Sequence, residues 1–533
     1  MTGRRRWMAY VRGQRFEDML DNMSVTLTSI LAIVTCASAA KVLLIPGPAV
    51  SHCLETLAVG KELLKRGHDV TLFAHLFDAK ACINRWDLSK FKSKFKTLSP
   101  ALDPDVIQKH NTFFEQNEKV MMDGTGLLKM LIFMVKPVIT NLCHTAFSDQ
   151  NVLNELQEEK YDLAVVEGLP MTGCIFSIPV YLGIPYAAIG SFIDPQDAMM
   201  PLQTILFPSL FLPYSNDMTF LERFINTITY FLNPLIKYAI IPSLDLSSYS
   251  EKLKTVDTRN LIKDSVLFLE NSDYFIDYPK ALFPNFLQVG GLTASPSNPL
   301  PEDLRKYIEG ARDGVILVTF GSVLKHVPQH VVERMMNAMA RLEQRILFKH
   351  NNEELKGNIK TMKWIPQNDV LGHPNVKLFV SHCGKNSLWE GIYHAVPIIC
   401  TPFGTDAVST GIKVMKYGVG SSVNILQGTT EEIFQTVQAV LGNKTIEQNM
   451  KTMSAIMRDR SETPSQRAAS AVEHVIKYGG DHMRPPELDF LSSIYADVWL
   501  IIFVFDFLLV SGVIFLCRKC WSIRKGLNKP KAD

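Results

Sequence analysis

The chain has 533 residues, which at about 150 residues per domain predicts several domains. Its 55 Lys and Arg residues nearly balance its 53 Asp and Glu residues, which argues against a nucleic-acid binder, a class that usually carries a strongly basic face. With 47% hydrophobic and 20% charged residues, the composition excludes wholesale disorder and indicates a membrane segment on a globular body.

Residues 1–40 are predicted to be a targeting segment. The uncharged apolar run 25–40 contains Ala37-Ser38-Ala39, which fits the cleavage pattern of a secretory signal. The residues before this run mix five arginines with three acids, and Met23 lies just before it. Whether translation begins at Met1 or at Met23 is therefore left open.

From residue 41 onward, apolar strand patterns alternate with helical periodicity, as in parallel sheets covered by helices. The first unit is a strand in KVLLIPG, a helix in CLETLAVGKELLKRGH and a strand in HDVTLFA. Further strands are predicted at 161–167, 185–191 and 265–271.

Residues 198–241 are strongly apolar, but their first part does not fit a membrane-crossing helix because Pro201, Pro208 and Pro213 interrupt it. We expect helices here that either line a pocket or lie on a membrane surface. Packing into a core is the alternative.

A break rich in Pro, Ser and Asn at 293–303 precedes a second unit of similar design. Its predicted strands are 314–322, 345–350, 376–382 and 396–402, with helices at about 328–342 and from 385. The predicted fold class is therefore α/β, a pair of doubly wound Rossmann-like domains. Two such domains that face each other place ligands at the carboxyl edges of both sheets.

The chain closes with a predicted membrane anchor. Residues 498–517 are almost entirely apolar, and this length suffices for a helix to cross a hydrocarbon core of ~30 Å. The tail 518–533 carries six basic residues and one acidic residue, which favours a cytosolic tail and a luminal body. Lys529-Pro-Lys531-Ala-Asp533 looks like the dilysine signal for retrieval to the endoplasmic reticulum. We predict a single-pass type I protein of that membrane.

The nine cysteines are scattered, and the close pair Cys517/Cys520 lacks the further ligands of a zinc site. We expect most cysteines to be small buried hydrophobic residues, with palmitoylation as a second option for the pair in the tail. Disulfide pairing in the body stays open.

The residues best suited to chemistry cluster between 364 and 406. His382 ends a predicted strand, and Gly384 permits a tight turn. Asn386 and Ser387 then open a helix, whose free N–H groups and partial positive charge can bind phosphate.

Glu390 lies four residues after Asn386 on the same helical face, where its carboxylate can accept hydrogen bonds from ribose hydroxyls. Trp364 offers a flat face on which a base can stack. Together the patterns W-x-P-Q, H-x-G-x-N-S-x-x-E and P-x-x-x-D closely resemble the signature of the UDP-glycosyltransferases, which include the UDP-glucuronosyltransferases. The resemblance runs from residue 41 to the end and includes ENSD at 270–273 and PNFLQVGG at 284–291.

This resemblance implies a GT-B architecture, with an acceptor-binding N-domain and a UDP-sugar-binding C-domain. UDP-sugar would be a co-substrate, and no metal or other cofactor is implied, because helix dipoles and His382 would offset the charge of the departing UDP. The donor residues that it implies are Trp364 for uracil, Gln367 for the nucleoside, Gly321, Ser322, His382, Gly384, Asn386 and Ser387 for the diphosphate, Glu390 for the ribose and Asp406 for the sugar.

In the N-domain, the resemblance implies that His52 is the catalytic base and that Glu167 orients it. The start of a helix favours a neutral, proton-accepting imidazole. The family has Asp where Glu167 stands, and a longer side chain can still reach His52 with some readjustment. The family also has an Asp-Gln pair where this chain has Asp406-Ala407, which leaves the donor sugar open.

We therefore predict an inverting glycosyltransferase that moves glucuronic acid or glucose from UDP to a hydroxyl of a small lipophilic acceptor. The alternative is a non-catalytic member that binds UDP-sugar or a lipophile as a carrier or subunit, and Ala407 supports it best. Homo- and hetero-oligomers are both left open. The predicted division of the chain is 1–40 targeting, 41–292 N-domain, 293–303 linker, 304–462 C-domain, 463–497 closing helix and juxtamembrane linker, 498–517 transmembrane helix and 518–533 cytosolic tail.

Overall fold

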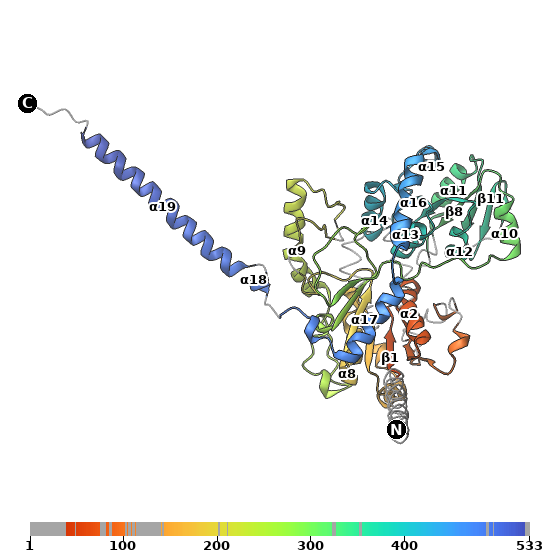
Figure 1. Cartoon of the computed structure of the whole chain (residues 1–533), viewed down its shortest axis with the longest axis horizontal. Coiled ribbons are helices and arrows are strands. Elements are labelled where there is room, and N and C mark those ends of the chain that lie inside the picture. Colours follow the sequence, from red (N-terminus) through yellow and green to blue (C-terminus); the bar gives the residue numbers. More distant parts are fainter. Residues whose placement is uncertain are drawn as a thin grey trace, which may run out of the picture.

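Two seven-stranded sheets form the frame of the molecule in a computed structural model, shown in Figure 1. The predicted signal segment, up to residue 38, and the predicted dilysine signal lie outside the described residues. The structure describes residues 39–527 apart from Pro48, 75–81, 85–87, most of 102–142, 201–202, 210–211, 322–326, 351–353, Gly404, 487–489 and Ile494.

The first sheet has the order β3-β2-β1-β4-β5-β6-β7, and all of its strand pairs are parallel. Its central strands are buried on both faces, which explains why they read as continuous apolar runs. The strands are β1 (Lys41–Ile45), β2 (Asp69–Phe73), β3 (Phe95–Leu98), β4 (Leu163–Glu167), β5 (Tyr186–Gly190), β6 (Leu267–Glu270) and β7 (Phe286–Gln288).

The second sheet has the order β10-β11-β9-β8-β12-β13-β14. Only the β10–β11 pair at its edge is antiparallel. The strands are β8 (Val315–Thr319), β9 (Arg345–Lys349), β10 (Leu355–Lys356), β11 (Ile359–Met362), β12 (Val376–Ser381), β13 (Ile398–Cys400) and β14 (Gly420–Ser422).

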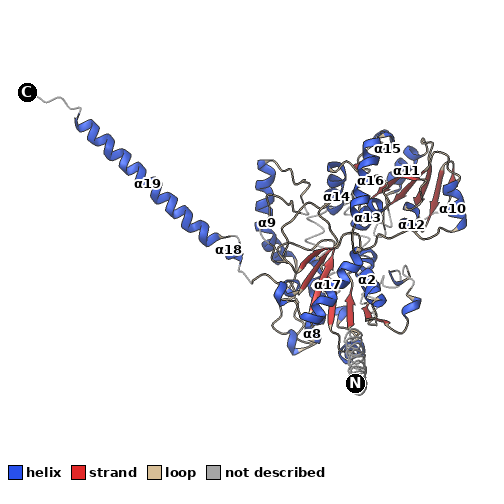
Figure 2. Ribbon diagram, in the orientation of Figure 1, coloured by secondary structure: helices blue, strands red, loops and turns tan. Residues whose placement is uncertain are grey.

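Figure 2 shows helices flanking both sheets. The α-helices are α2 (Val50–Lys65), α7 (Gln150–Glu158), α8 (Ser177–Leu182), α9 (Phe220–Ile240), α10 (Glu302–Glu309), α11 (Gln329–Met339), α12 (Gln367–Leu371), α13 (Lys385–Tyr393), α14 (Thr405–Lys416), α15 (Thr430–Gly442), α16 (Lys444–Arg458), α17 (Pro464–Tyr478), α18 (Phe490–Ser493) and α19 (Ala496–Leu527). The prediction of two doubly wound α/β units is confirmed.

Every strand predicted from an apolar run is present, but the prediction missed β3, β7, β10, β11 and β14. These strands are only two to four residues long. In all of them except β7, half or more of the residues are partly or fully exposed. Strands of this length without a clear apolar pattern do not stand out from a polar loop.

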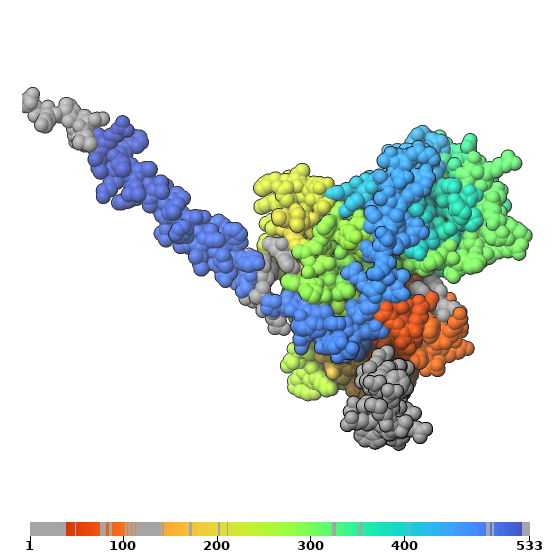
Figure 3. All heavy atoms as spheres, in the orientation of Figure 1, coloured from red at the N-terminus to blue at the C-terminus, as the bar shows by residue number. Residues whose placement is uncertain are grey.

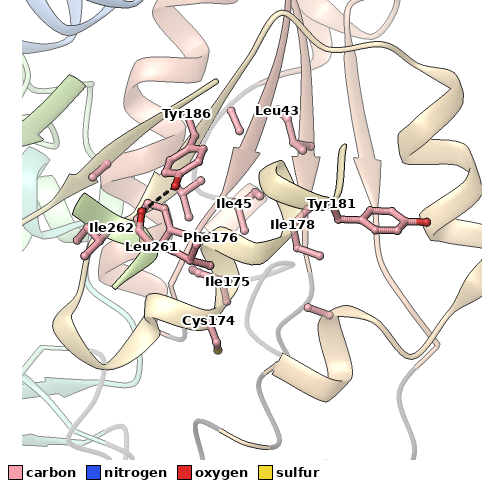
Figure 4. Close-up of a cluster of buried hydrophobic side chains, with 14 of the residues drawn as sticks. Leu43, Ile45, Cys174, Ile175, Phe176, Ile178, Tyr181, Tyr186, Leu261 and Ile262 are labelled. Carbon is pink, nitrogen blue, oxygen red and sulfur yellow. Dashed lines mark hydrogen bonds between the residues drawn. The ribbon is translucent and has the colours of Figure 1, made fainter. Parts of the chain in front are cut away.

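Hydrophobic clusters fill both faces of each sheet. Figure 4 shows one of them, in which Phe176 and Ile178 lie near Ile45 of β1. The buried hydroxyl of Tyr186 donates to the carbonyl of Leu261 at 2.7 Å, so this polar group is satisfied within an apolar layer.

Helix α17 returns from the second half of the chain to pack beside α2 of the first (Figure 1). Ala468 and Val472 of α17 belong to the same buried cluster as Leu57 of α2. Glu473 pairs with Arg66 at 2.6 Å and with the imidazole of His68 at 2.8 Å. Both apolar and charged contacts therefore hold this crossing.

Six of the described cysteines form three disulfides, and this answers the question of pairing that the sequence left open. The six are buried, as expected. Cys517 and Cys520 are unpaired and exposed. The disulfides are Cys53–Cys82, Cys143–Cys174 and Cys383–Cys400.

Helix α19 contains the whole predicted apolar run 498–517. An 18-residue window within its segment Ala496–Arg524 has a mean hydropathy of 2.8, and the segment is long and apolar enough to cross a membrane. The helix extends away from the body in Figure 1, and its apolar side chains are exposed. Such a surface suits lipid rather than water.

Candidate functional site

Each sheet has a topological switch point, where successive connections leave in opposite directions. The switch lies between β1 and β4 in the first sheet and between β8 and β12 in the second. In open α/β sheets, ligands bind beyond the carboxyl ends of the strands at such a point. His52 follows β1, and Glu167 ends β4. Gly321 and His382 follow β8 and β12, so both predicted site regions lie at switch points.

The imidazole of His52 and the carboxylate of Glu167 contact each other as predicted, with 2.8 Å between Nδ1 and Oε1. The Glu167 side chain is fully buried, and that of His52 is 15% exposed. Two glycines make room for the carboxylate. A Cβ on Gly47 would lie 2.6 Å from Cγ of Glu167, and one on Gly190 would lie 2.8 Å from its Oε1. The longer acid therefore reaches His52 because both neighbours lack a side chain.

The pKa of His52 reflects opposing influences. Burial lowers it, but the charge of Glu167 and the hydrogen bond to it, with smaller contributions from Glu55 and Asp406, raise the pKa to about 9. The position at a helix start favours a neutral imidazole, and the surrounding carboxylates oppose that influence. The carboxylates therefore favour the protonated ring, and the neutral ring that accepts a proton becomes more populated as the pH rises.

Glu55 is a buried acid that the sequence analysis did not single out. It lies three residues after His52 on α2, is 2% exposed, and accepts a hydrogen bond from Ser191 at 2.8 Å. Burial raises the pKa of Glu55 to about 7, although the charge of His52 lowers it. The sequence did carry a signal for Glu55, because it is an acid on the apolar face of a predicted helix.

A chain of hydrogen bonds joins this acid to the second half of the molecule. The Asn271 amide donates to Ser191 and to the side-chain oxygen of Asn386, both at 3.2 Å. The Asn386 amide in turn donates to the carbonyl of Ser51 at 3.1 Å. Asn271, from the ENSD motif, therefore connects the region of His52 to the first turn of α13.

The imidazole of His382 is sandwiched between two glycines at the other switch point. A Cβ on Gly321 would lie 2.4 Å from its Cε1, and one on Gly384 would lie 2.6 Å from its Nε2. Gly321 also has φ +76°, a conformation that favours glycine. Both predicted glycines are therefore needed for the ring to occupy this place.

His382 is neutral at physiological pH, because burial and the charge of Lys349 lower its pKa to about 4. Its Nδ1 is buried and has no hydrogen-bond partner among the described residues. The ring can therefore offer a hydrogen bond to an anion without contributing a positive charge.

Lys349 is a second residue that sequence reasoning missed. It ends β9, at the same edge of the sheet, and its ammonium group donates to the carbonyl of Gly321. Its Nζ lies 5.8 Å from the centre of the Trp364 ring. The sequence did carry a signal for Lys349, because it lies at the end of a predicted strand, at the carboxyl edge of the second sheet, where an anion is expected to bind.

Gln367 connects the remaining predicted residues of this half. Its Oε1 accepts from Thr319 at 2.7 Å, and its Nε2 donates to Glu390 at 2.7 Å and to Ser387 at 3.2 Å. Trp364 is 49% exposed, an unusual degree for a tryptophan and one that leaves a face for stacking.

Asp406 lies at the start of α14 and close enough to His52 for their charges to interact. Burial raises the pKa of Asp406, while the charges of His52 and Lys385 lower it. Ala407 beside it is 3% exposed.

Ser322 lies outside the described residues. Within the described part of the chain, no group of three or more His, Cys, Asp or Glu side chains could hold a metal ion.

Comparison with known proteins shows which family the chain belongs to. The family model described as UDP-glucoronosyl and UDP-glucosyl transferase matches residues 40–531. UDP-glucuronosyltransferase 3A1 of Xenopus laevis is 28% identical over 482 residues, covering 88% of this chain and 90% of its own. The 2-hydroxyacylsphingosine 1-beta-galactosyltransferase of Homo sapiens is 26% identical over 456 residues, covering 84% and 82%.

Two solved structures share the fold. Medicago truncatula UGT71G1 complexed with UDP-glucose has a TM-score of 0.55 at 15% identity, over 82% of this chain and 98% of its own. The glycotransferase of kitacinnamycin has a TM-score of 0.55 at 16% identity, over 82% and 99%. These likenesses confirm the GT-B pair of domains that the motifs predicted.

Proposed function

The chain belongs to the family of UDP-glucoronosyl and UDP-glucosyl transferases, and on that premise we propose that His52 is the base that activates a hydroxyl of a small lipophilic acceptor for transfer of a sugar from UDP. The observation that carries this proposal is the 2.8 Å contact between His52 and the buried Glu167 at the β1/β4 switch point. A UDP-sugar glycosyltransferase needs a group of this kind, because an alcohol is a weak nucleophile.

In the proposed reaction, Nε2 of His52 takes the proton of the acceptor hydroxyl while Glu167 holds Nδ1. The acceptor oxygen then forms a bond to the anomeric carbon as the bond from that carbon to UDP breaks, with inversion of configuration. Glu167 orients the ring and stabilises the imidazolium that forms. The contribution of such a base is about 10²–10⁴-fold in rate.

We assign the donor to the edge of the second sheet. Trp364 would stack on uracil, Gln367 would contact the nucleoside, and Glu390 would bind the ribose hydroxyls. The turn residues Gly321, Ser322, His382, Gly384, Asn386 and Ser387 would surround the diphosphate. The cation of Lys349, 5.8 Å from the Trp364 ring centre, supports an anionic ligand here.

Asp406 would bind the donor sugar, for which we propose glucuronic acid or glucose. The side chain of Ala407 offers no hydrogen bond where the family has Gln. A screen of UDP-glucuronic acid, UDP-glucose and UDP-galactose, with UDP release as the readout, would identify the donor. Activity with UDP-galactose alone would contradict this choice.

We further propose that residues 41–292 bind the acceptor and 304–462 bind the donor, with the segment 463–497 leading to the anchor. The body would lie in the lumen of the endoplasmic reticulum, with 518–533 in the cytosol. Three disulfides support an oxidising compartment, because cytosolic thiols are kept reduced. The apolar helix α19 supports the membrane anchor.

The test compares wild-type protein with His52→Ala in microsomes supplied with each UDP-sugar and a phenolic acceptor. We expect UDP release to fall by about 10²–10⁴-fold while UDP still raises the melting temperature of the variant. Equal UDP release from both proteins would refute the catalytic proposal and favour the carrier alternative.

A further inference from the structure

Helix α9 presents an apolar face to its surroundings. Thr219 and Glu222 form a capping box at its start, and only Asn226 is buried among its residues. Large apolar side chains recur every three or four residues along the outer face, as expected for one side of a helix. Six of them, 44–76% exposed, are Phe220, Leu221, Phe224, Ile228, Leu232 and Leu235.

The polar side of α9 faces the protein. Asn226 is 1% exposed and donates to the carbonyls of Thr204 at 2.7 Å and Phe207 at 3.0 Å. Two turns before the other end, Asn233 donates to Asp194 at 2.8 Å, and one turn later Lys237 pairs with the buried Asp197. A helix on a water-exposed surface has the opposite arrangement, with its apolar side inward.

These bonds prevent the helix from burying its apolar face by rotation. Turning α9 inward would leave the buried Asp197 carboxylate without the Lys237 ammonium group and would remove the Asn233 amide from Asp194, at a cost greater than that of exposing single leucines. Ile205 and Leu206, in the segment that the inner side of α9 contacts, are also 64% and 55% exposed. Contiguous surfaces of this kind mark interaction sites.

The linker between the body and the membrane-length helix α19 indicates what covers this apolar surface. Helix α17, which packs on the body, ends at Tyr478, and the membrane-length helix α19 begins at Ala496. The 17 residues between them could span at most ~60 Å if fully extended, and η6 (Asp481–Met483) and α18 shorten that reach. In the view of Figures 1 and 3, α9 stands at the edge of the body on the side of α18. The linker therefore holds the body near any bilayer that α19 crosses.

We propose that α9 lies in the interfacial layer of the bilayer that α19 crosses, with its apolar face among the lipid chains and its polar face on the protein. The proposal goes beyond sugar transfer and rests on the anchor rather than on the chemistry of the site. Because the outer face is apolar rather than basic, lipid chains and not anionic headgroups are the partner.

The test uses the full chain in nanodiscs of phosphatidylcholine, at one chain per disc, with a protease site inserted after Pro486. Cleavage separates the body from α19, and size-exclusion chromatography then shows whether the body elutes with the disc. We expect the wild-type body to stay on the disc at high salt, because apolar contacts are not screened. A body that leaves the disc overturns the proposal.

The matched variant carries Phe220→Ser, Leu221→Ser and Phe224→Ser, and the control carries Leu355→Ser, an apolar residue 65% exposed on the second half. Loss of each inserted side chain should weaken partitioning about tenfold. The triple variant should therefore leave the disc, and the control should stay. Retention of the triple variant overturns the proposal, since another surface would then hold the body.

A second measurement does not depend on cleavage. An environment-sensitive dye on Phe224→Cys, with Cys517→Ser and Cys520→Ser, should be quenched by brominated lipid, whereas the same dye on Lys451→Cys of α16 should not. Equal responses at both positions contradict insertion. A dye at 224 that is shielded only when chains are concentrated in detergent would instead indicate a second copy and overturn the lipid assignment.

Discussion

The side-chain amide of Asn386 donates to the carbonyl oxygen of Ser51 at 3.1 Å, so the first turn of α13 touches the first turn of the helix that carries His52. Asn271 donates to the same Asn386 at 3.2 Å. The proposed diphosphate turn and the proposed base therefore share hydrogen bonds across the two halves of the molecule.

Asn271→Ala should lower kcat more than it weakens UDP binding, because it removes bonds between the halves and leaves the diphosphate turn intact. The loss of a buried hydrogen bond predicts about a 5- to 100-fold decrease. Asn386→Ala, which also removes a proposed phosphate contact, should additionally raise the donor KM. Steady-state kinetics with UDP titration calorimetry separates these effects. An Asn271→Ala variant that loses only UDP affinity would contradict the coupling.

The activity should rise with pH toward the pKa of His52, which the carboxylates raise to about 9, because only the neutral ring accepts a proton. Glu55→Gln keeps an acceptor for Ser191 but removes a nearby negative charge. The pKa of His52 should then fall, and the acid limb of the kcat/KM profile should move to lower pH. An unmoved acid limb would show that Glu55 has no electrostatic influence on the base.

Trp364→Ala should weaken UDP binding about 5- to 150-fold, the range expected for loss of one base-stacking contact. The control is Leu355→Ala, which removes a side chain 65% exposed on the same half. Titration calorimetry with UDP provides the measurement. Unchanged affinity in Trp364→Ala would place the uracil elsewhere.

Asp277→Asn should destabilise the fold by about 3–5 kcal/mol, because the buried Asp277 carboxylate pairs with the ammonium groups of Lys385 and Lys413. Burial raises the pKa of Asp277, but the two lysine charges outweigh burial and hold that pKa below its usual range. This stabilisation is thus present near neutral pH and is lost as the pH falls toward the lowered pKa.

Thermal unfolding at several pH values tests the role of Asp277. The matched control is Glu309→Gln, whose pair with Arg305 is exposed and should contribute little. If Asp277→Asn and Glu309→Gln unfold at the same temperature near neutral pH, the buried cluster does not stabilise the two halves.

Asn443 should carry a glycan if the body is luminal, since Asn443-Lys444-Thr445 is an acceptor sequence on an exposed helix start. Endoglycosidase treatment should increase the gel mobility of the wild-type protein but not that of Asn443→Gln. A wild-type protein without this shift would remove the support that glycosylation gives to a luminal body.

The positions of the long buried strands along the chain and the motif at 364–406 were accessible from sequence, because both are local signals. Buried parallel strands read as apolar runs, and His382, Asn386 and Glu390 lie within one strand–helix unit. The roles of Asn271 and Lys349 depend on which strands become neighbours. Their contacts to Asn386 and Gly321 lie 115 and 28 residues away along the chain.

The sequence also could not predict which face of α9 packs inward, although the helical periodicity was clear. An amphipathic pattern predicts two faces but does not state which one packs inward. Here Asp194 and Asp197 on a preceding loop select the polar face. The apolar segment 198–241 was expected to line a pocket, to lie on a membrane surface or to pack into a core, and the exposed apolar face of α9 argues against the core.

Gly47 and Gly190, which lie against the side chain of Glu167, restrict which substitutions this chain can accept at the three positions. A side chain at position 47 or 190 would collide with the carboxylate, whereas a shorter acid at position 167 would vacate that space and lose its reach to His52. Substitution at any one of the three positions should therefore be harmful alone and tolerated only when the others change with it. Relatives should divide into two groups, those with the long acid and two glycines and those with a short acid and freedom at both flanking positions.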